Sequence, residues 1–197
     1  MSSPSFRLLR LPLVAQRHII DFWTPYEIYQ LSVVSKKSKI VARLSAKQKP
    51  KLSILLEQNL GVKLDFSIGT WRFECRYGPQ RPRQEFEYYC SDSEEDEAIN
   101  GNYRITQRDD RLNIFSIYTF HLISDFLKMM EQIFDVFGCV MDHVEIGDSV
   151  SDVRLIRVIS WMNNCPRIVG VTSVNASTDK RNIFDKHFEK SVTVLLL

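Results

Sequence analysis

Cysteine and histidine are the residue types in this chain that most readily ligate metals or act as nucleophiles, and their spacing favours neither chemistry. The four cysteines stand at positions 75, 90, 139 and 165 without a Cys-x-x-Cys pair, and the four histidines at 18, 121, 143 and 187 form no HExxH motif. Cys139 and His143 come nearest to a ligand pair, and we interpret them as a buried thiol near a strand residue. The sequence predicts no metal site, and unpaired cysteines favour an intracellular protein.

Other catalytic signatures are also missing from the sequence. The seven glycines form no phosphate-binding loop, and no G-x-S-x-G elbow is present. The acid pair Asp109-Asp110 lies in a turn-like, polar context. We therefore expect a protein that is not an enzyme and that uses no cofactor.

Charge divides the chain into two parts. The 197 residues carry a net charge of +2, but residues 1–51 contain ten Lys or Arg and two acids, for a net charge of +8. The remaining 146 residues have a net charge of −6, from 16 basic and 22 acidic side chains. This asymmetry predicts two domains, 1–51 and 52–197. Neither a transmembrane run nor a signal peptide is recognised, so an intracellular, cytoplasmic or nuclear protein is expected.

Residues 1–51 predict three short helices. Pro12 begins one that runs to about Phe22, Thr24-Pro25 supplies an N-cap and first-turn proline for the next, and 35–44 is a basic third helix. Three helices of this length enclose little core, yet the segment is rich in Leu, Ile, Val, Phe and Trp. Some of these apolar side chains should face a partner or the second domain.

The same segment resembles the F-box motif from Leu11 to Lys39 without a gap. The resemblance is carried by Leu11-Pro12, Ile19, Pro25, Ile28, Leu31-Ser32 and Val34-Ser35-Lys36-Lys37. The sequence departs from the usual pattern at Ala15 and Gln16, where leucines are common, and at Ser38, where tryptophan is common. The short F-box proteins of the nematode type are the most similar subgroup.

The resemblance implies a docking role for this domain. F-boxes bind the Skp-type adaptor of a cullin-RING ubiquitin ligase, through which they reach a cullin. The implied adaptor-binding residues are Leu11, Pro12, Ile19, Pro25, Ile28, Leu31, Val34 and Lys36. Ile19 and Leu31 can equally pack inside the three-helix domain, and Pro12 and Pro25 can serve only to begin helices.

Strand patterns follow from residue 62 onward. Alternation over 62–77, broken at Gly69, predicts two strands and a turn, and 86–90, 103–106 and 112–120 are further strand candidates. An acidic, solvated loop is expected at about 91–98. Ser91 and Ser93 each precede an acid by three residues, which suits phosphorylation by an acid-directed kinase; a plain solubilising loop is the alternative.

The C-terminal third repeats itself every 25 residues. Helices are expected at 120–137, 152–162 and 178–190, each followed by a short strand. Four apolar columns keep the period: Val144, Val169 and Val194; Ile146, Val171 and Leu196; Ile133, Val158 and Ile183; Phe134, Ile159 and Phe184. Such units are typical of leucine-rich-repeat-like arrays with a parallel sheet, and an ordinary α/β domain with crossover helices is the alternative.

Residues 62–197 also resemble the type-two F-box-associated domain that follows many nematode F-boxes. The fold class expected is α+β: a small three-helix F-box, then mixed strands leading into leucine-rich-repeat-like units. The apolar ending 194–197 suggests a chain truncated relative to its relatives. If Val144, Val169 and Val194 face the helices, the opposite face would bind a protein substrate through His143, Glu145, Gly170, Thr172, Thr193 and Leu195.

The resemblance therefore predicts a non-catalytic substrate receptor of an SCF-type ligase. Nucleic-acid binding is the main alternative, because seven basic residues lie within 36–51 after two helices and a short turn. Few base-reading side chains accompany them, and the rest of the chain is acidic. A scaffold that binds the adaptor without a role in ubiquitin transfer is a third interpretation.

Overall fold

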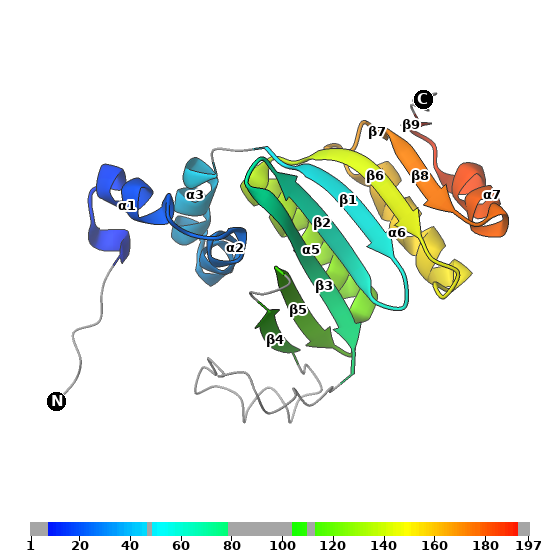
Figure 1. Ribbon diagram of the computed structural model, residues 1–197, viewed down its shortest axis with the longest axis horizontal. Helices are drawn as coiled ribbons and strands as arrows, with labels where there is room; N and C mark the ends of the chain where they lie inside the picture. The colour runs from blue at the N-terminus through cyan, green and yellow to red at the C-terminus, as the bar shows by residue number, and fades with distance from the viewer. Residues whose placement is uncertain (1–7, 47–48, 79–103, 110–112, 193–197) are drawn as a thin grey trace. The chain divides into compact units, whose positions relative to one another are not determined.

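The computed structural model describes residues 8–46, 49–78, 104–109 and 113–192, which form two compact units (Figure 1). The first, here called the helical unit, comprises residues 1–49 and 131–139. The second, the sheet unit, comprises 50–130 and 140–197. The predicted strand 86–90, the acidic loop with Ser91 and Ser93, and the site residues Thr193 and Leu195 all lie outside the described residues.

The helical unit contains a 3-10 turn, η1 (Leu8–Arg10), and the helices α1 (Leu13–Ile20), α2 (Pro25–Val34) and α3 (Lys36–Ser45). The predicted start of α2 is confirmed: Thr24 Oγ1 accepts from the Glu27 N–H, and the Glu27 carboxylate accepts from the Thr24 N–H at 2.6 Å. Ser35 and Ser38 form the equivalent reciprocal pair at the start of α3. These caps satisfy backbone donors that would otherwise be unpaired at the helix ends.

The end of helix α5 (Leu122–Phe137) completes the helical unit. The Gln132 amide donates to Ser32 Oγ at 2.7 Å, across 100 residues of sequence, and Lys39 forms an ion pair with Asp135. The buried centre of the unit contains Ile20, Tyr26, Ile28, Tyr29, Val41, Ala42, Ile133, Phe134, Val136 and Phe137. The sequence placed 131–139 only in the second domain, and its packing with the helices was not expected.

The sheet unit is built on a seven-stranded mixed sheet with the order β4-β5-β3-β2-β1-β6-β8. Its strands are β1 (Lys51–Leu56), β2 (Leu60–Phe66), β3 (Gly69–Tyr77), β4 (Arg104–Asp109), β5 (Ile114–Thr119), β6 (Val140–Ile146) and β8 (Ser173–Ala176). The predicted pair of strands broken at Gly69 is confirmed as β2 and β3. Strand β6 is parallel to β1 and to β8, and β5 is parallel to β3, so the expected parallel pairing occupies half of a mixed sheet.

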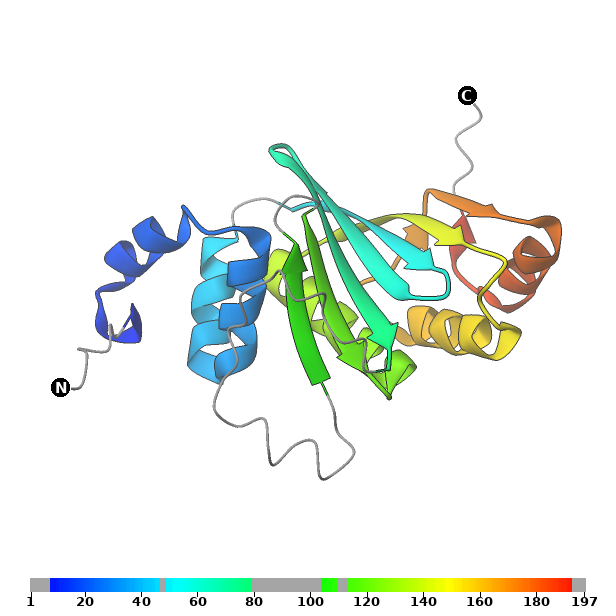
Figure 2. The same cartoon turned by 60° about the horizontal axis from the view of Figure 1, so that its bottom comes forward.

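One face of this sheet is covered by helices. Figures 1 and 2 show α5 and α6 (Asp152–Asn164) on the same side of the strands. That side contains Leu52, Ile54 and Leu56 of β1 with their partners Leu64, Val62 and Leu60 of β2, all with no exposed surface. At the predicted start of α6 the cap is Ser151 rather than Asp152, since Ser151 Oγ accepts from the Arg154 N–H.

The strand register does not follow the 25-residue spacing. Val144 pairs with Val174, an offset of 30 residues, and Gly170 of β7 (Gly170–Val171) pairs with Ser191 of β9 (Ser191–Val192), an offset of 21. Val169, expected to face the helices, precedes β7 and is 83% exposed. In the helix columns Val158, Ile159 and Phe184 are buried as expected, whereas Ile183 of α7 (Thr178–His187) is half-buried. The 25-residue spacing therefore predicts most of the buried positions of the helices. It does not predict the strand partners, because the turn after α6 changes the register of the strands that follow.

Gly170 allows the close approach of β7 and β9. A Cβ at this position would lie 2.5 Å from the Ser191 carbonyl oxygen and 2.6 Å from its Oγ. We expect Gly170→Ala to lower the free energy of unfolding by about 2 kcal/mol, because neither strand can move without losing its pairing. Urea unfolding measures the loss. Gly147→Ala is the control, since its Cβ would meet the flexible Glu57 Cγ at 3.1 Å, and equal losses in both variants would contradict the explanation.

Candidate protein-docking surfaces

The eight residues expected to bind an adaptor occupy three kinds of environment in the helical unit. Pro25 and Ile28 are buried, and they belong to the unit's own packing in the isolated chain. Leu11, Ile19 and Leu31 are half-buried. Pro12, Val34 and Lys36 are exposed, and Val34 has 74% of its surface in solvent. The accessible part of the expected set therefore lies at the start of α1 and at the junction between α2 and α3.

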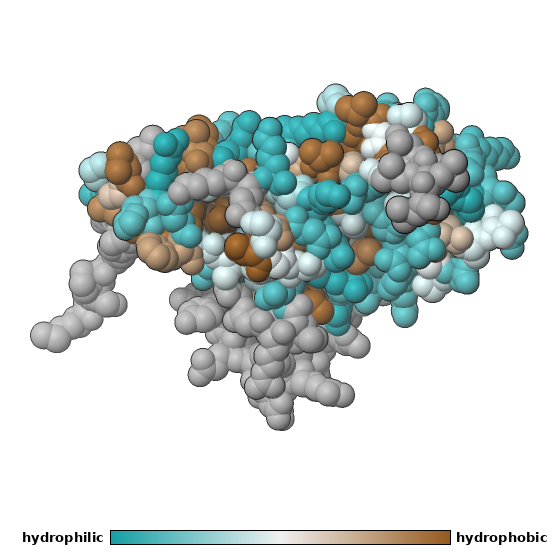
Figure 3. Space-filling view, turned by 45° about the horizontal axis from the view of Figure 1, so that its top comes forward, coloured by the Kyte–Doolittle hydropathy of each residue, from teal (hydrophilic) through white to brown (hydrophobic). Residues whose placement is uncertain are grey.

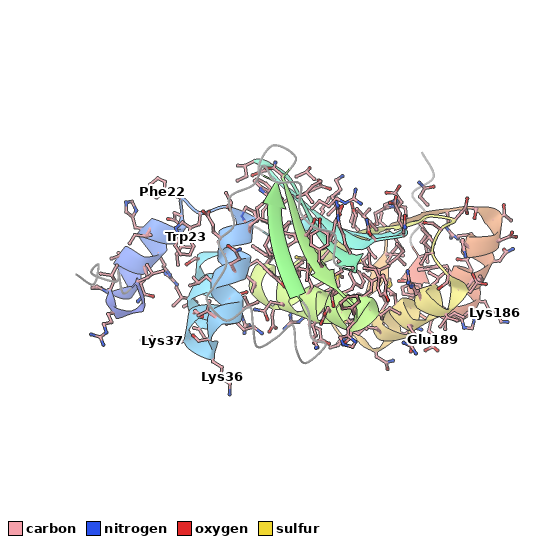
Figure 4. The ribbon with its side chains drawn as sticks, turned by 90° about the horizontal axis from the view of Figure 1, so that it is seen from below. Phe22, Trp23, Lys36, Lys37, Lys186 and Glu189 are labelled. Carbon is pink, nitrogen blue, oxygen red and sulfur yellow. The ribbon has the colours of Figure 1, made fainter. Side chains whose placement is uncertain are left out.

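Further exposed apolar side chains surround this set. Phe22, which follows α1, is 79% exposed, and its ring lies nearly perpendicular to the His18 ring with the ring centroids 5.6 Å apart. Figure 4 shows Phe22 projecting from the end of α1 beside Trp23, and Figure 3 shows apolar surface over the helices. Among the described residues of the unit, Val14, Val33, Ile40 and Leu44 are also exposed. The unit thus has a small buried core and still exposes apolar surface to solvent, as its composition predicted.

These additional residues were not among the predicted contacts. Phe22, Val33, Ile40 and Leu44 match no position quoted for the F-box resemblance. Their signal in the sequence was the excess of apolar residues over the volume that three short helices can enclose. The packing of the folded unit then determines which of these apolar side chains stay exposed to solvent.

Gln16 occupies one of the positions where the motif usually has leucine, and its side chain is 5% exposed. Its amide nitrogen donates to the Leu11 carbonyl at 2.6 Å, which links the chain before α1 to the helix. Its Oε1 is buried and finds no hydrogen-bond partner among the described residues. The side chain therefore gains one hydrogen bond and loses the hydration of one acceptor.

We expect Gln16→Leu to be tolerated and Gln16→Ala to be costly. Leucine fills the same site without an unsatisfied acceptor, so thermal unfolding should show a stability change within about 1 kcal/mol of the wild type. Alanine leaves a cavity and should cost about 2 kcal/mol. If leucine were as damaging as alanine, the hydrogen bond to Leu11 would have to outweigh packing.

The expected substrate-binding residues divide into two groups in the sheet unit. His143 and Glu145 point to the sheet face opposite Val144 and Ile146, as expected from the alternation of side chains along a strand. His143 Nδ1 hydrogen-bonds Ser173 Oγ at 2.7 Å, and Glu145 lies opposite Asn175. Gly170 of β7 instead pairs with Ser191 of β9. The Thr172 N–H donates to the Asp142 carbonyl at 2.7 Å.

A charged cluster on the same face was not predicted. Register places Glu74 of β3, Gly61 of β2, Leu55 of β1 and Glu145 of β6 in one row across the sheet. Arg72, Lys63, Ser53 and His143 form the next row. No helix of the described residues covers this face (Figures 1 and 2), which is here called the polar sheet face. It joins acidic and basic side chains of β2, β3 and β6 with Ser53 and Leu55 of β1.

Glu74 is the centre of the polar sheet face, although it is only 3% exposed. It forms ion pairs with Arg72 and with Arg76, whose Nη2 lies 2.8 Å from Glu74 Oε2. Burial lowers the pKa of Arg76, but the Glu74 carboxylate and Tyr118 outweigh burial and raise that pKa overall. The Arg76 guanidinium is therefore held in its charged form beside the Glu74 carboxylate.

The described residues form neither a metal-binding cluster nor a membrane-spanning helix. In the ranges 8–46, 49–78, 104–109 and 113–192, no group of three His, Cys, Asp or Glu side chains is placed to hold a metal ion. Among the helices of that part of the chain, none has the length and apolarity that a membrane span requires. A comparison of the chain with models of known protein families, with curated proteins and with solved structures finds no match.

Proposed function

We propose that this chain is a non-catalytic substrate receptor of an SCF-type cullin-RING ubiquitin ligase. The helical unit binds the Skp-type adaptor as an F-box, and the sheet unit, as a type-two F-box-associated domain, binds the protein substrate. The observation that carries the proposal is the coincidence of two features in residues 11–39: the gapless F-box resemblance, and exposed apolar side chains on a unit whose small core is already filled.

Exposed apolar surface supports a helical partner. Val34 and Phe22 would lose solvent contact when a helix of a partner docks against them, and each aliphatic or aromatic side chain buried in this way contributes about 1.5–3 kcal/mol. The buried members of the expected set, Pro25 and Ile28, then support the helices from inside rather than touching the adaptor.

The polar sheet face supports the second half of the proposal. His143, Glu145 and Ser173 lie on adjacent strands without a covering helix, and rigid strands present side chains at fixed spacing. A substrate segment with charges of both signs would match this face. Phosphorylation of Ser91 or Ser93 remains a prediction, since both lie outside the described residues.

Nucleic-acid binding is the second candidate, and one observation favours it. Lys36, Lys37 and Arg43 are exposed on α3, where they can contact phosphates. The interleaved Ile40 and Leu44 have no role in such a contact. The adaptor is therefore the better explanation of the whole surface.

The test is a titration of the full chain with purified Skp-type adaptor, followed by calorimetry and size-exclusion chromatography. We expect a 1:1 complex with a Kd of about 1 µM or tighter. A parallel titration uses a 20-base-pair DNA duplex at increasing salt. Binding to DNA with a steep salt dependence and none to the adaptor would replace the proposal with the second candidate, whereas binding to neither would overturn both.

A further inference from the structure

The exposed side of α3 combines positive charge with aliphatic surface. At about 100° per residue, Lys36, Lys37, Ile40, Arg43 and Leu44 fall within an arc of about 120°. All five are exposed, whereas Ser38, Val41, Ala42 and Ser45 on the opposite side are buried. This arc of five residues is called the basic-apolar face below, and Figure 4 labels Lys36 and Lys37 on it.

Cationic side chains outnumber acidic ones in the helical unit. Lys39 is the α3 cation that turns inward, where it pairs with Asp135. The unit as a whole contains nine Lys or Arg and four Asp or Glu, of which Glu27 caps α2 and Asp135 holds Lys39. The exposed cations Lys36, Lys37 and Arg43 therefore leave α3 with a strongly positive outer side.

From this combination of positive charge and exposed aliphatic surface, we infer that the partner of the helical unit presents an acidic, amphipathic helix to the basic-apolar face. This inference rests on the proposed function and specifies the partner's chemistry at the same unit. Two aliphatic side chains between three cations match a helix whose own aliphatic residues are flanked by Asp and Glu. Charge complementarity of this kind accelerates encounter, whereas the apolar contacts hold the complex together.

The alternatives fit the face less well. A DNA backbone would use the three cations but would cover Ile40 and Leu44 without a favourable contact. An anionic membrane surface requires a broad apolar side to bury in the lipid, and α3, ten residues long, has its other side packed inside the unit. An acidic helix uses both kinds of side chain.

Association kinetics with the purified Skp-type adaptor test the inference. Between 50 and 500 mM salt, the association rate constant of the wild type should fall roughly tenfold, with less than about a threefold change in the dissociation rate constant. Lys36→Glu with Lys37→Glu should lower the association rate constant about tenfold at 50 mM salt and remove most of its salt dependence. Both positions lie in the first turn of α3, where acids favour the helix, so the fold should be retained.

The control is Arg157→Glu with Lys186→Glu, which makes the same charge change at exposed positions of α6 and α7. It should leave the association rate constant within about twofold of the wild type. Ile40→Ser with Leu44→Ser should instead raise the dissociation rate constant about tenfold and keep the salt dependence of association.

The inference alone would be overturned by adaptor binding whose association rate constant is independent of salt, or by equal effects of the Lys36/Lys37 and control variants. It would also be overturned if the Lys36/Lys37 variant bound adaptor normally but lost binding to a 20-base-pair DNA duplex or to phosphatidylserine vesicles. Absence of any adaptor binding by the wild type would overturn the proposed function and the inference together.

Discussion

Val34→Asp is expected to weaken adaptor binding by about a hundredfold or more. Val34 ends α2 and is 74% exposed, so the substitution removes little packing from the isolated chain. In the proposed complex the adaptor covers this side chain, and a carboxylate there would lose its hydration without a partner. Calorimetric titration of the adaptor into wild type and variant measures the difference.

Val169→Asp is the matched control for this prediction. Val169 is 83% exposed in the sheet unit, and the same change there should leave the adaptor Kd within about twofold of the wild type. An acid at the C-terminal end of α2 costs at most about 1 kcal/mol of stability, which thermal unfolding monitors. Normal adaptor binding by Val34→Asp would exclude this junction from the interface.

Lys190→Met should have the largest effect on stability, a loss of about 3 kcal/mol in the free energy of unfolding. The Lys190 ammonium donates to the carbonyls of Met162, Cys165 and Ile168 at 2.8, 2.6 and 2.5 Å. These carbonyls belong to the end of α6 and the turn after it, where intrahelical donors run out. Methionine keeps much of the side-chain volume but supplies no donor.

Urea unfolding followed by circular dichroism tests the prediction, with Lys186→Met as the control. Lys186 is exposed in the last turn of α7, so its replacement should change stability by less than about 0.5 kcal/mol. Hydrogen exchange in α6 and β7 should accelerate in the Lys190 variant. Equal stability of the two variants would mean that water replaces the ammonium at those carbonyls at no cost.

Asn163 makes a second polar connection between the end of α6 and the segment after α7. Its amide donates to the His187 carbonyl at 2.8 Å, and its Oδ1 accepts from the Glu189 N–H at 3.1 Å. Together with Lys190, it ties the segment after α7 to the end of α6. This region is therefore fixed by polar contacts between residues about 25 apart, a role for the repeat spacing that its apolar columns did not indicate.

Local signals predicted the elements well where one sheet face or one helix side is polar. The N-cap at Thr24, the turn at Gly69 and the amphipathic helix α5 were all predicted, since each depends on residues within a few positions of one another. Strand β1 was missed. Leu52, Ile54 and Leu56 are buried on one face and Ser53 and Leu55 on the other, so no alternation of polar and apolar residues marked the strand.

For the candidate sites, the sequence predicted the helices and the excess of apolar residues. It did not predict which of those apolar residues are buried in the unit and which are exposed. Ile28 and Val34 match the same motif, yet one is buried and the other exposed, because α3 and the end of α5 cover only part of α2. The placement of Gly170 against Ser191 likewise follows from the turn after α6.

The sequence by itself determined the N-cap of α2, the amphipathic helices and the charge difference between the two parts of the chain, because capping, turn and periodicity signals act between neighbouring residues. The tertiary structure alone decided the strand order, the membership of 131–139 in the helical unit and the assembly of the polar sheet face from four strands. Those features depend on which distant segments bury apolar area together, and many pairings of similar strands satisfy the same local pattern.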